Sequence, residues 1–149
     1  MRCCMFAIVF LAIAAGDAYC EPPDDDIQQQ AKQLEGTWTF SSAIDDGNKV
    51  PAERIRGAKM VFTKDKLVMV TPDGTKAELD YKLYGGNSPR WFDLINKGQA
   101  DPGIYQIEKD ILTICIATRY EGKDVVRPSD FKSTGDNPTN ILTLVRERK

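Results

Sequence analysis

A glycine and a tryptophan in the first predicted strand, with an arginine in the last, constrain the fold more than any other feature of this 149-residue chain. Gly36 and Trp38 open the strand predicted for 37–43, and Arg146 lies in the strand predicted for 140–147. If the first strand pairs with the last, the indole covers the bottom of a closed sheet. The guanidinium then lies across its face, a cation–π contact worth roughly 0.5–2 kcal/mol. The three residues therefore predict the structural closure of a small β-barrel.

Short alternating segments separated by turn residues make up most of the chain after residue 36. Strands are predicted over 37–43, 58–63, 66–71, 77–84, 90–95, 104–108, 111–117 and 140–147. Helices are predicted over 24–34 and, for one or two turns, over 51–57, whereas 98–103 is predicted to be a loop and 120–132 an edge strand or an extended loop. About eight short strands with little helix are typical of an antiparallel barrel or sandwich. The inward phase shared by Trp38 and Arg146 favours an all-β, antiparallel up-and-down β-barrel with a short N-terminal helix.

The first residues carry the pattern of an export signal. Arg2 supplies a positive charge, an apolar run extends from Met5 to Ala15, and small residues follow up to Ala18. The apolar run is too short for a membrane span, which takes about 20 residues. We therefore expect export to the periplasm, the cell envelope or the medium, and no membrane span. The predicted parts of the chain are a signal peptide over 1–18, a leader with the short helix over 19–33, and the barrel domain over 34–149.

The cysteines do not form the framework of a disulfide-rich domain. Cys3 and Cys4 lie within the predicted signal peptide, which leaves Cys20 and Cys115. Cys115 lies inside an apolar strand and is predicted to be a small core residue, with a bridge to Cys20 as the less favoured alternative. Lipid anchoring at Cys20 is not expected, because Tyr19 stands where that modification requires a small residue.

Charge and composition exclude several classes of function. The net charge is −2 with interspersed signs, so the basic stripe of a nucleic-acid-binding protein is missing. The chain has no histidine, which excludes Ser-His-Asp and Cys-His nucleophile systems and removes the commonest transition-metal ligand. The carboxylates of Asp93, Asp101, Asp110 and Asp130 leave acid–base catalysis as the one remaining enzyme route. We predict a non-enzymatic protein with no catalytic residue, metal or cofactor.

The segment around Trp91 has two interpretations. In the first, Trp91 orients a ligand at the mouth of the barrel beside an ion pair between Asp93 and Arg127. In the second, which we favour, Trp91 is a surface aromatic residue packed against the helix or a neighbouring strand, and Asp93 forms a structural ion pair. The two interpretations differ in whether these side chains face a ligand or other parts of the protein.

The size of the inward side chains decides whether the barrel is hollow. The residues predicted to face inward are Trp38, Phe40, Met60, Phe62, Leu67, Met69, Leu79, Tyr81, Leu83, Phe92, Leu94, Tyr105, Ile107, Leu112, Ile114, Ile116, Leu142 and Leu144. An eight-stranded barrel is either just filled by such side chains or holds one small ligand. We expect a mostly packed interior with, at most, a pocket near the open end. The ligand-binding candidates are Tyr81 and Tyr105, whose hydroxyls need partners, together with Met69, Phe92 and Trp91.

Several blocks in order resemble one family of exported domains. They are Leu-Glu-Gly-Thr-Trp (34–38), Val-Pro-Ala-Glu-Arg (50–54), Gly-Ala-Lys-Met-Val-Phe-Thr (57–63), Thr-Pro-Asp-Gly-Thr (71–75), Pro-Gly-Ile-Tyr (102–105), Leu-Thr-Ile-Cys-Ile-Ala (112–117) and Arg-Pro-Ser-Asp-Phe (127–131). Together they resemble a lipocalin-like family abundant in planctomycete bacteria, over nearly all of 33–147. The resemblance implies a calycin-type barrel in a Gram-negative envelope or secreted fraction, and it brings no catalytic residues. Met60 and Met69 depart from it, since branched aliphatic residues are expected there.

These observations leave two functions open. The leading one is an exported lipocalin-like barrel that binds a small hydrophobic or amphipathic ligand. The alternative is a packed barrel that serves as a protein-interaction or cell-envelope structural module, through loops around 46–49, 85–89 and 122–127. The expected partner is therefore a small apolar molecule in the first case and an envelope protein in the second.

Overall fold

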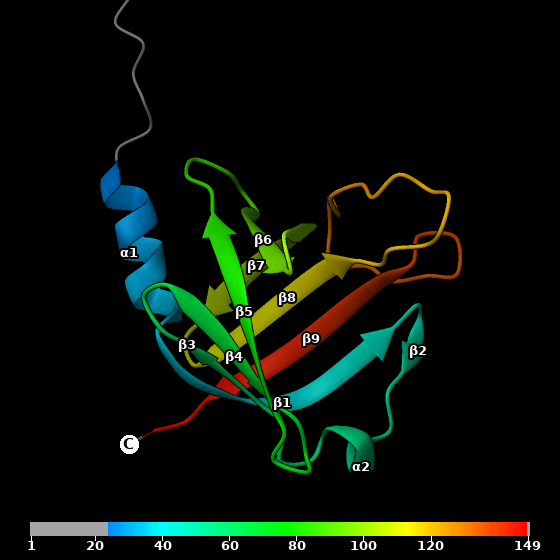
Figure 1. Ribbon diagram of the computed structural model, residues 1–149, viewed down its shortest axis with the longest axis horizontal. Coiled ribbons are helices and arrows are strands. Elements are labelled where there is room, and N and C mark those ends of the chain that lie inside the picture. The colour runs from blue at the N-terminus through cyan, green and yellow to red at the C-terminus, as the bar shows by residue number, and fades with distance from the viewer. Residues whose placement is uncertain (1–23, 149) are drawn as a thin grey trace, which may run out of the picture.

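One antiparallel sheet closes on itself to form a barrel, with a helix along one side (Figure 1). The computed structural model describes residues 24–148. The predicted signal peptide, Cys20 and the leader before Asp24 lie outside the described residues. The elements run in the order α1 (Asp24–Leu34), β1 (Gly36–Asp45), β2 (Asn48–Lys49), α2 (Ala52–Ile55), β3 (Lys59–Phe62), β4 (Lys66–Val70), β5 (Lys76–Leu83), β6 (Arg90–Asn96), β7 (Gln99–Glu108), β8 (Ile111–Ala117) and β9 (Thr139–Arg146).

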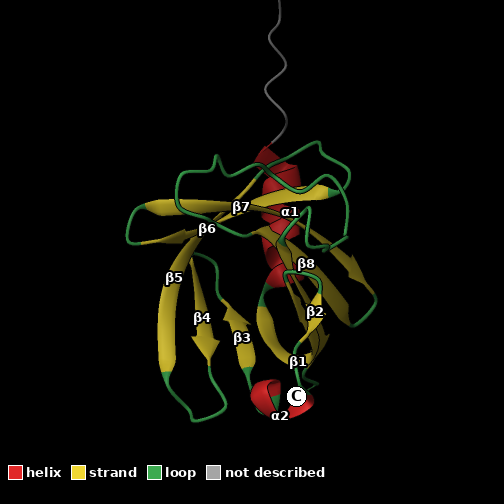
Figure 2. Cartoon of the chain, turned by 90° about the vertical axis from the view of Figure 1, so that its right-hand side faces the viewer, coloured by secondary structure: helices red, strands yellow, loops and turns green. Residues whose placement is uncertain are grey.

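Strand pairing follows the order of the chain, and β1 pairs with β9 to close the barrel. Eight strands form the closed wall, and the short β2 adds a hairpin to the end of β1. Figure 2 shows β3, β4 and β5 side by side, with β6 and β7 crossing above them. The prediction of an all-β, up-and-down barrel with a short N-terminal helix is confirmed.

The predicted contact at the barrel floor is present. Trp38 and Arg146 are directly opposite partners in the ladder between β1 and β9. The guanidinium carbon of Arg146 lies 4.0 Å from the centre of the indole, which is fully buried. Gly36 has a φ of 127°, and a β-carbon there would lie 3.2 Å from Nη1 of Arg146. Glycine is therefore required at this position both for the backbone and for the space that Arg146 occupies.

The barrel interior forms one apolar cluster. Every residue that alternation predicts to face inward belongs to it, either buried or packed against it. Helix α1 adds three residues, Ile27, Ala31 and Leu34, which cover one end of the interior. The helix is tied to the floor because the indole N–H of Trp38 donates to the carbonyl of Leu34 at 2.8 Å.

A second apolar cluster lies on the outer wall. It consists of Ile104, Cys115 and Ile141, with Ile44 and Phe131 packed against it. Phe131 comes from the long connection between β8 and β9, residues 118–138, which we call the strap and which appears as the orange loop in Figure 1. The strap contains no strand, so the extended-loop alternative for 120–132 is right and the edge-strand alternative is wrong.

The predicted loop over 98–103 is also wrong, because β7 begins at Gln99. Lys97 and Gly98 both have positive φ, as a tight hairpin turn requires, and Asn96 pairs with Gln99 across it. Pro102 and Gly103, which indicated a loop in the sequence, lie within the strand. Pro102 pairs with Asp93 of β6. Gly103 makes room for the buried ring of Phe92, which also lies on β6.

Candidate functional site

The interior of the barrel is packed with its own side chains where helix α1 covers it. There, between Leu34, Phe62, Phe92, Tyr105 and Ile114, about 150 Å³ of space remains between atoms. None of this space is wide enough for a water molecule. Leu34 contributes from helix α1, so the helix helps to fill the barrel as well as to cover it.

Both tyrosine hydroxyls that were expected to need partners have found them within the protein. The hydroxyl of Tyr105 donates to Oε1 of Gln30 on α1 at 2.6 Å, and burial raises the pKa of Tyr105 to about 12. The hydroxyl of Tyr81 donates to the carbonyl of Thr63 at 2.7 Å, and burial is also the main cause of its raised pKa. Each hydroxyl therefore already donates its hydrogen bond within the protein.

The other ligand-binding candidates lie on different faces of the wall. Phe92 is buried inside the barrel, where its ring meets that of Tyr105 edge to face at 5.9 Å. Met69 is partly buried and pairs with Met60. Trp91 follows the opposite phase of β6 and is 40% exposed on the outer wall. The structure therefore does not bring these candidates together in one cavity.

Arg127 joins the strap to the outer wall beside Trp91. Its Nη2 lies 2.6 Å from Oδ1 of Asp93, and its Nη1 donates to the carbonyls of Phe92 and Gly103 at 2.7 Å each. The guanidinium carbon lies 4.9 Å from the ring centre of Trp91. The ion pair between Asp93 and Arg127 and the exposed position of Trp91 fit both interpretations, which differ in whether Trp91 contacts a ligand.

Tyr84 completes this cluster from the end of β5. Its hydroxyl donates to Oδ2 of Asp93 at 2.5 Å, and this hydrogen bond is the main cause of the raised pKa of Tyr84. The guanidinium of Arg127 lies 5.2 Å from the ring centre of Tyr84, so it sits between two aromatic rings. Both members of the ion pair are shielded from water, with side chains 20% and 14% exposed.

Two adjoining pockets lie between the strap and the outer faces of β6 and β7. The first has a volume of about 480 Å³ and the second about 300 Å³. They share Ser88, Pro89 and Ser129 and therefore adjoin at these residues, and we call the two pockets together the outer groove. The first pocket is also lined by Arg90, Tyr105, Gln106, Ile107, Asp130 and Phe131, and the second by Trp91, Arg127 and Pro128.

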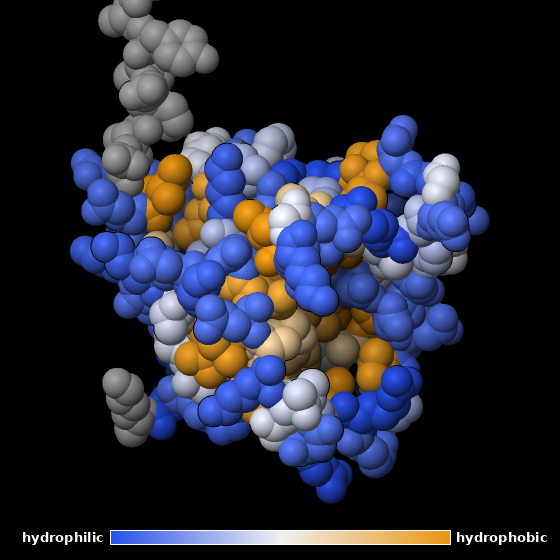
Figure 3. Space-filling model, viewed as in Figure 1, coloured by the Kyte–Doolittle hydropathy of each residue, from blue (hydrophilic) through white to orange (hydrophobic). Residues whose placement is uncertain are grey.

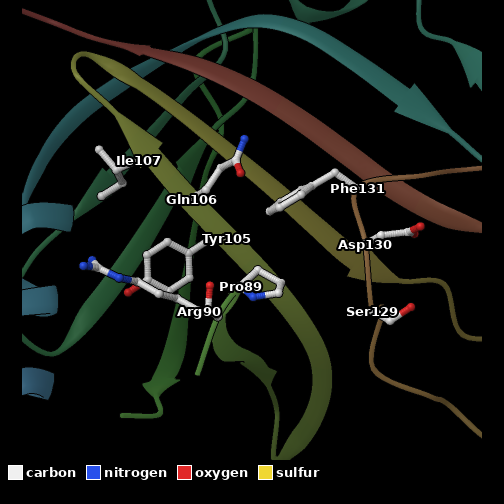
Figure 4. A pocket seen from close by; sticks show the side chains of 9 residues that line it. Pro89, Arg90, Tyr105, Gln106, Ile107, Ser129, Asp130 and Phe131 are labelled. Carbon is white, nitrogen blue, oxygen red and sulfur yellow. The ribbon is translucent and has the colours of Figure 1, made fainter. Parts of the chain in front are cut away.

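Figure 4 shows how the first pocket is built. Gln106 projects from β7, and Phe131 lies across from it on the strap, with Pro89 below and Asp130 at the far side. Within residues 24–148, the side chains of Ser88, Gln106 and Ser129 form no hydrogen bond with another protein group. The groove therefore combines apolar walls with polar side chains that are free to bind a ligand.

A third depression, of about 530 Å³, lies at the barrel floor around Gly36 and Arg146. Three of its four charged side chains are already engaged within the protein. Arg146 donates to the carbonyls of Gln33 and Glu35, Glu147 pairs with Lys59, and Arg148 pairs with Asp110. We therefore assign this region to barrel closure.

The carboxylates considered for acid–base catalysis are dispersed, and each has a cationic partner. Asp93 pairs with Arg127, Asp101 with Arg119, Asp110 with Arg148, and Asp130 with Lys132. In the described part of the chain, no three side chains of the metal-binding types gather around one point. No helix formed by residues 24–148 is long and apolar enough to cross a membrane.

Sequence reasoning found part of the outer groove, because Trp91, Arg127 and the loop over 85–89 were singled out as possible contact sites and line it. It missed Gln106, which lies at an outward position of a predicted strand, and Ser129 and Phe131 of the strap. No local pattern indicated that these segments would face each other. Comparison of the chain with protein-family models, with curated proteins and with solved structures gave no match.

Proposed function

We propose that the protein is an exported, non-enzymatic lipocalin-like barrel that binds a small amphipathic molecule in the outer groove. One observation carries the proposal. The interior has no room for water around Leu34, Phe92 and Tyr105, whereas a pocket of about 480 Å³ lies between the strap and β7. Ligand pockets usually measure about 300–1,000 Å³. The interior then serves as a rigid scaffold for a site on its outside.

The lining of the groove supports an amphipathic ligand. Pro89, Trp91 and Phe131 supply apolar surfaces, and the unengaged side chains of Gln106 and Ser129 supply hydrogen-bond donors and acceptors. A pocket with mainly apolar walls and a few placed polar groups binds a molecule by the apolar surface and orients it by the polar atoms.

The non-enzymatic part of the proposal rests on the pairing of the acidic groups. The carboxylates of Asp93 and Asp130, which lie nearest the groove, are both engaged in ion pairs. The chain also lacks histidine.

Binding of small neutral probes tests the proposal. Indole, phenol and benzyl alcohol are titrated into isotope-labelled protein, and backbone and methyl resonances are followed. We expect shifts at Pro89, Gln106 and Phe131 and none at interior methyl groups such as those of Leu112. Ser129→Trp places a large side chain where the two pockets meet and should abolish binding, whereas Ile111→Trp, on an exposed part of β8, should leave binding unchanged. Shifts confined to the interior methyl groups would contradict the proposal.

A second function, contact with another protein through the partly open end of the barrel, is favoured by one specific observation. Phe40, Met69, Leu94 and Leu142 belong to the interior cluster but are only partly buried. Figure 3 shows apolar side chains in a hollow near the middle of one face, with hydrophilic side chains around it. If a second copy of the chain covers these residues, sedimentation velocity will show association that Met69→Lys removes. A wild-type protein that stays monomeric at high concentration would exclude that form of the contact.

A further inference from the structure

We infer that the outer groove binds a neutral carbohydrate of at least two sugar rings, one ring in each pocket. This inference rests on the proposed function, because it names the chemistry of the ligand for the same site. Three features of the groove carry it: the position of the aromatic side chains, the unengaged polar groups and the balance of charge.

Each pocket is lined by one aromatic side chain that is not fully buried, and the buried Tyr105 also lines the first pocket. Phe131 lines the first pocket, and Trp91, 40% exposed, lines the second. A sugar ring has an apolar face made of C–H groups and an edge of hydroxyl groups. The flat apolar body of an aromatic side chain matches such a face. Two aromatic residues in adjoining pockets therefore match two consecutive rings.

The polar groups of the groove match the hydroxyl edge. Ser88 and Ser129 line both pockets, and Gln106 lines the first. Serine hydroxyls and the glutamine amide each both donate and accept hydrogen bonds, as sugar hydroxyls do. The two serines lie where the pockets meet, which is where the link between two rings and the hydroxyls beside it would lie.

The charges around the groove favour a neutral ligand. Arg127 is committed to Asp93 and to two backbone carbonyls, and Asp130 pairs with Lys132 at 3.0 Å. The guanidinium of Arg90 donates to the neutral side chain of Gln33 at 2.6 Å. A charged ligand that bound Arg127 or Asp130 would break an existing ion pair, and an ionised group that loses its partner on burial is costly. A hydroxylated neutral molecule requires no such exchange.

The experiment compares single sugars with their dimers. Glucose, cellobiose, N-acetylglucosamine and N,N′-diacetylchitobiose are titrated separately into labelled protein, up to concentrations of about 10 mM because weak sites have dissociation constants near 1 mM. We expect at least one disaccharide to bind about tenfold more tightly than its monosaccharide, which corresponds to about 1.4 kcal/mol. The shifted resonances should include those of Trp91, Gln106 and Phe131.

Two variants and a control locate the rings. Trp91→Ala removes the aromatic surface of the second pocket and should reduce the affinity for the disaccharide to that for the monosaccharide. Gln106→Ala should weaken both sugars. Ile111→Ala changes an exposed apolar residue elsewhere on the wall and should change neither. Circular dichroism melting curves show that each variant is folded.

The outcomes separate this inference from the proposed function. If no sugar shifts any resonance while indole still shifts those of the groove, the carbohydrate inference is wrong and the proposed function stands. If sugars bind with equal affinity to wild type, Trp91→Ala and Gln106→Ala, the site lies elsewhere and the inference is again wrong. If neither sugars nor the aromatic probes reach the groove, both are wrong.

Discussion

Gly103 lies so close to the ring of Phe92 that a β-carbon at position 103 would be 2.6 Å from Cε1 of that ring. The two residues face each other across β6 and β7. The carbonyl of Cys115 on β8 would be only 2.8 Å from the same β-carbon. Gly103 also offers its carbonyl to Arg127, so one small residue sets both the packing of the interior ring and the attachment of the strap.

Gly103→Ala should therefore destabilise the protein by about 1–3 kcal/mol, because overpacking a filled core forces side chains and backbone to move. Urea unfolding followed by fluorescence measures the change. Gly135→Ala is the matched control, because nothing lies within 4 Å of a β-carbon there. Equal stability of the two variants would show that the space around Gly103 is not restricted.

Trp38→Ala should cost about 3–5 kcal/mol, the usual range for removing a large buried side chain. Arg146→Ala should cost less, because the two hydrogen bonds to the carbonyls of Gln33 and Glu35 and the cation–π contact are each modest. Arg148→Ala should leave the melting temperature unchanged, since that side chain is 85% exposed. A larger loss from Arg148→Ala than from Arg146→Ala would contradict the assignment of the floor.

Arg127→Met should release the strap while the barrel stays folded. The substitution removes the hydrogen bonds from Arg127 to Asp93 and to two carbonyls, at a cost of about 1–3 kcal/mol for each group left unpaired, while Asp93 keeps the hydrogen bond from Tyr84. Cys115 provides the readout, because it is fully buried beneath the strap and burial raises the pKa of its thiol. Alkylation of Cys115, located by peptide mass mapping, should accelerate in Arg127→Met.

The control for that measurement is Lys132→Met, which removes a partner from a largely exposed ion pair on the same strap. Its Cys115 should react as slowly as that of the wild type. An unchanged rate in Arg127→Met, with the protein folded, would show that Arg127 does not hold the strap in place.

The buried Tyr105 should make the free energy of unfolding depend on pH in the alkaline range. Burial raises its pKa from 10.0 to about 12 in the folded protein, so the neutral phenol is favoured there. A group whose pKa is higher in the folded state contributes stability that is complete below its unfolded pKa. This contribution is therefore present up to pH 10 and lost as the pH rises toward 12. Urea unfolding at several pH values should show a weaker loss above pH 10 in Tyr105→Phe.

Most of the fold could be predicted from the alternation of apolar and polar residues along the strands. Each strand residue points to the opposite side from its neighbour, so the inward set can be read from local order alone. This is why every residue predicted to face inward is found in the interior cluster. The prediction of a loop over 98–103 was wrong because Pro102 and Gly103 lie within a strand. Residue 103 is a glycine because the ring of Phe92 on β6 occupies the space that a side chain would fill.

The sequence by itself determined the barrel, the inward phase of its strands and the meeting of Trp38 with Arg146, because these follow from a period of two and from which strands are first and last. Tertiary structure alone decided that helix α1 helps to fill the interior and that the strap creates a groove on the outer wall. Both depend on contacts between residues far apart in the chain, such as Gln30 with Tyr105 and Arg127 with the carbonyl of Phe92. No local pattern encodes the space left between two such surfaces, since that space depends on how every intervening side chain packs.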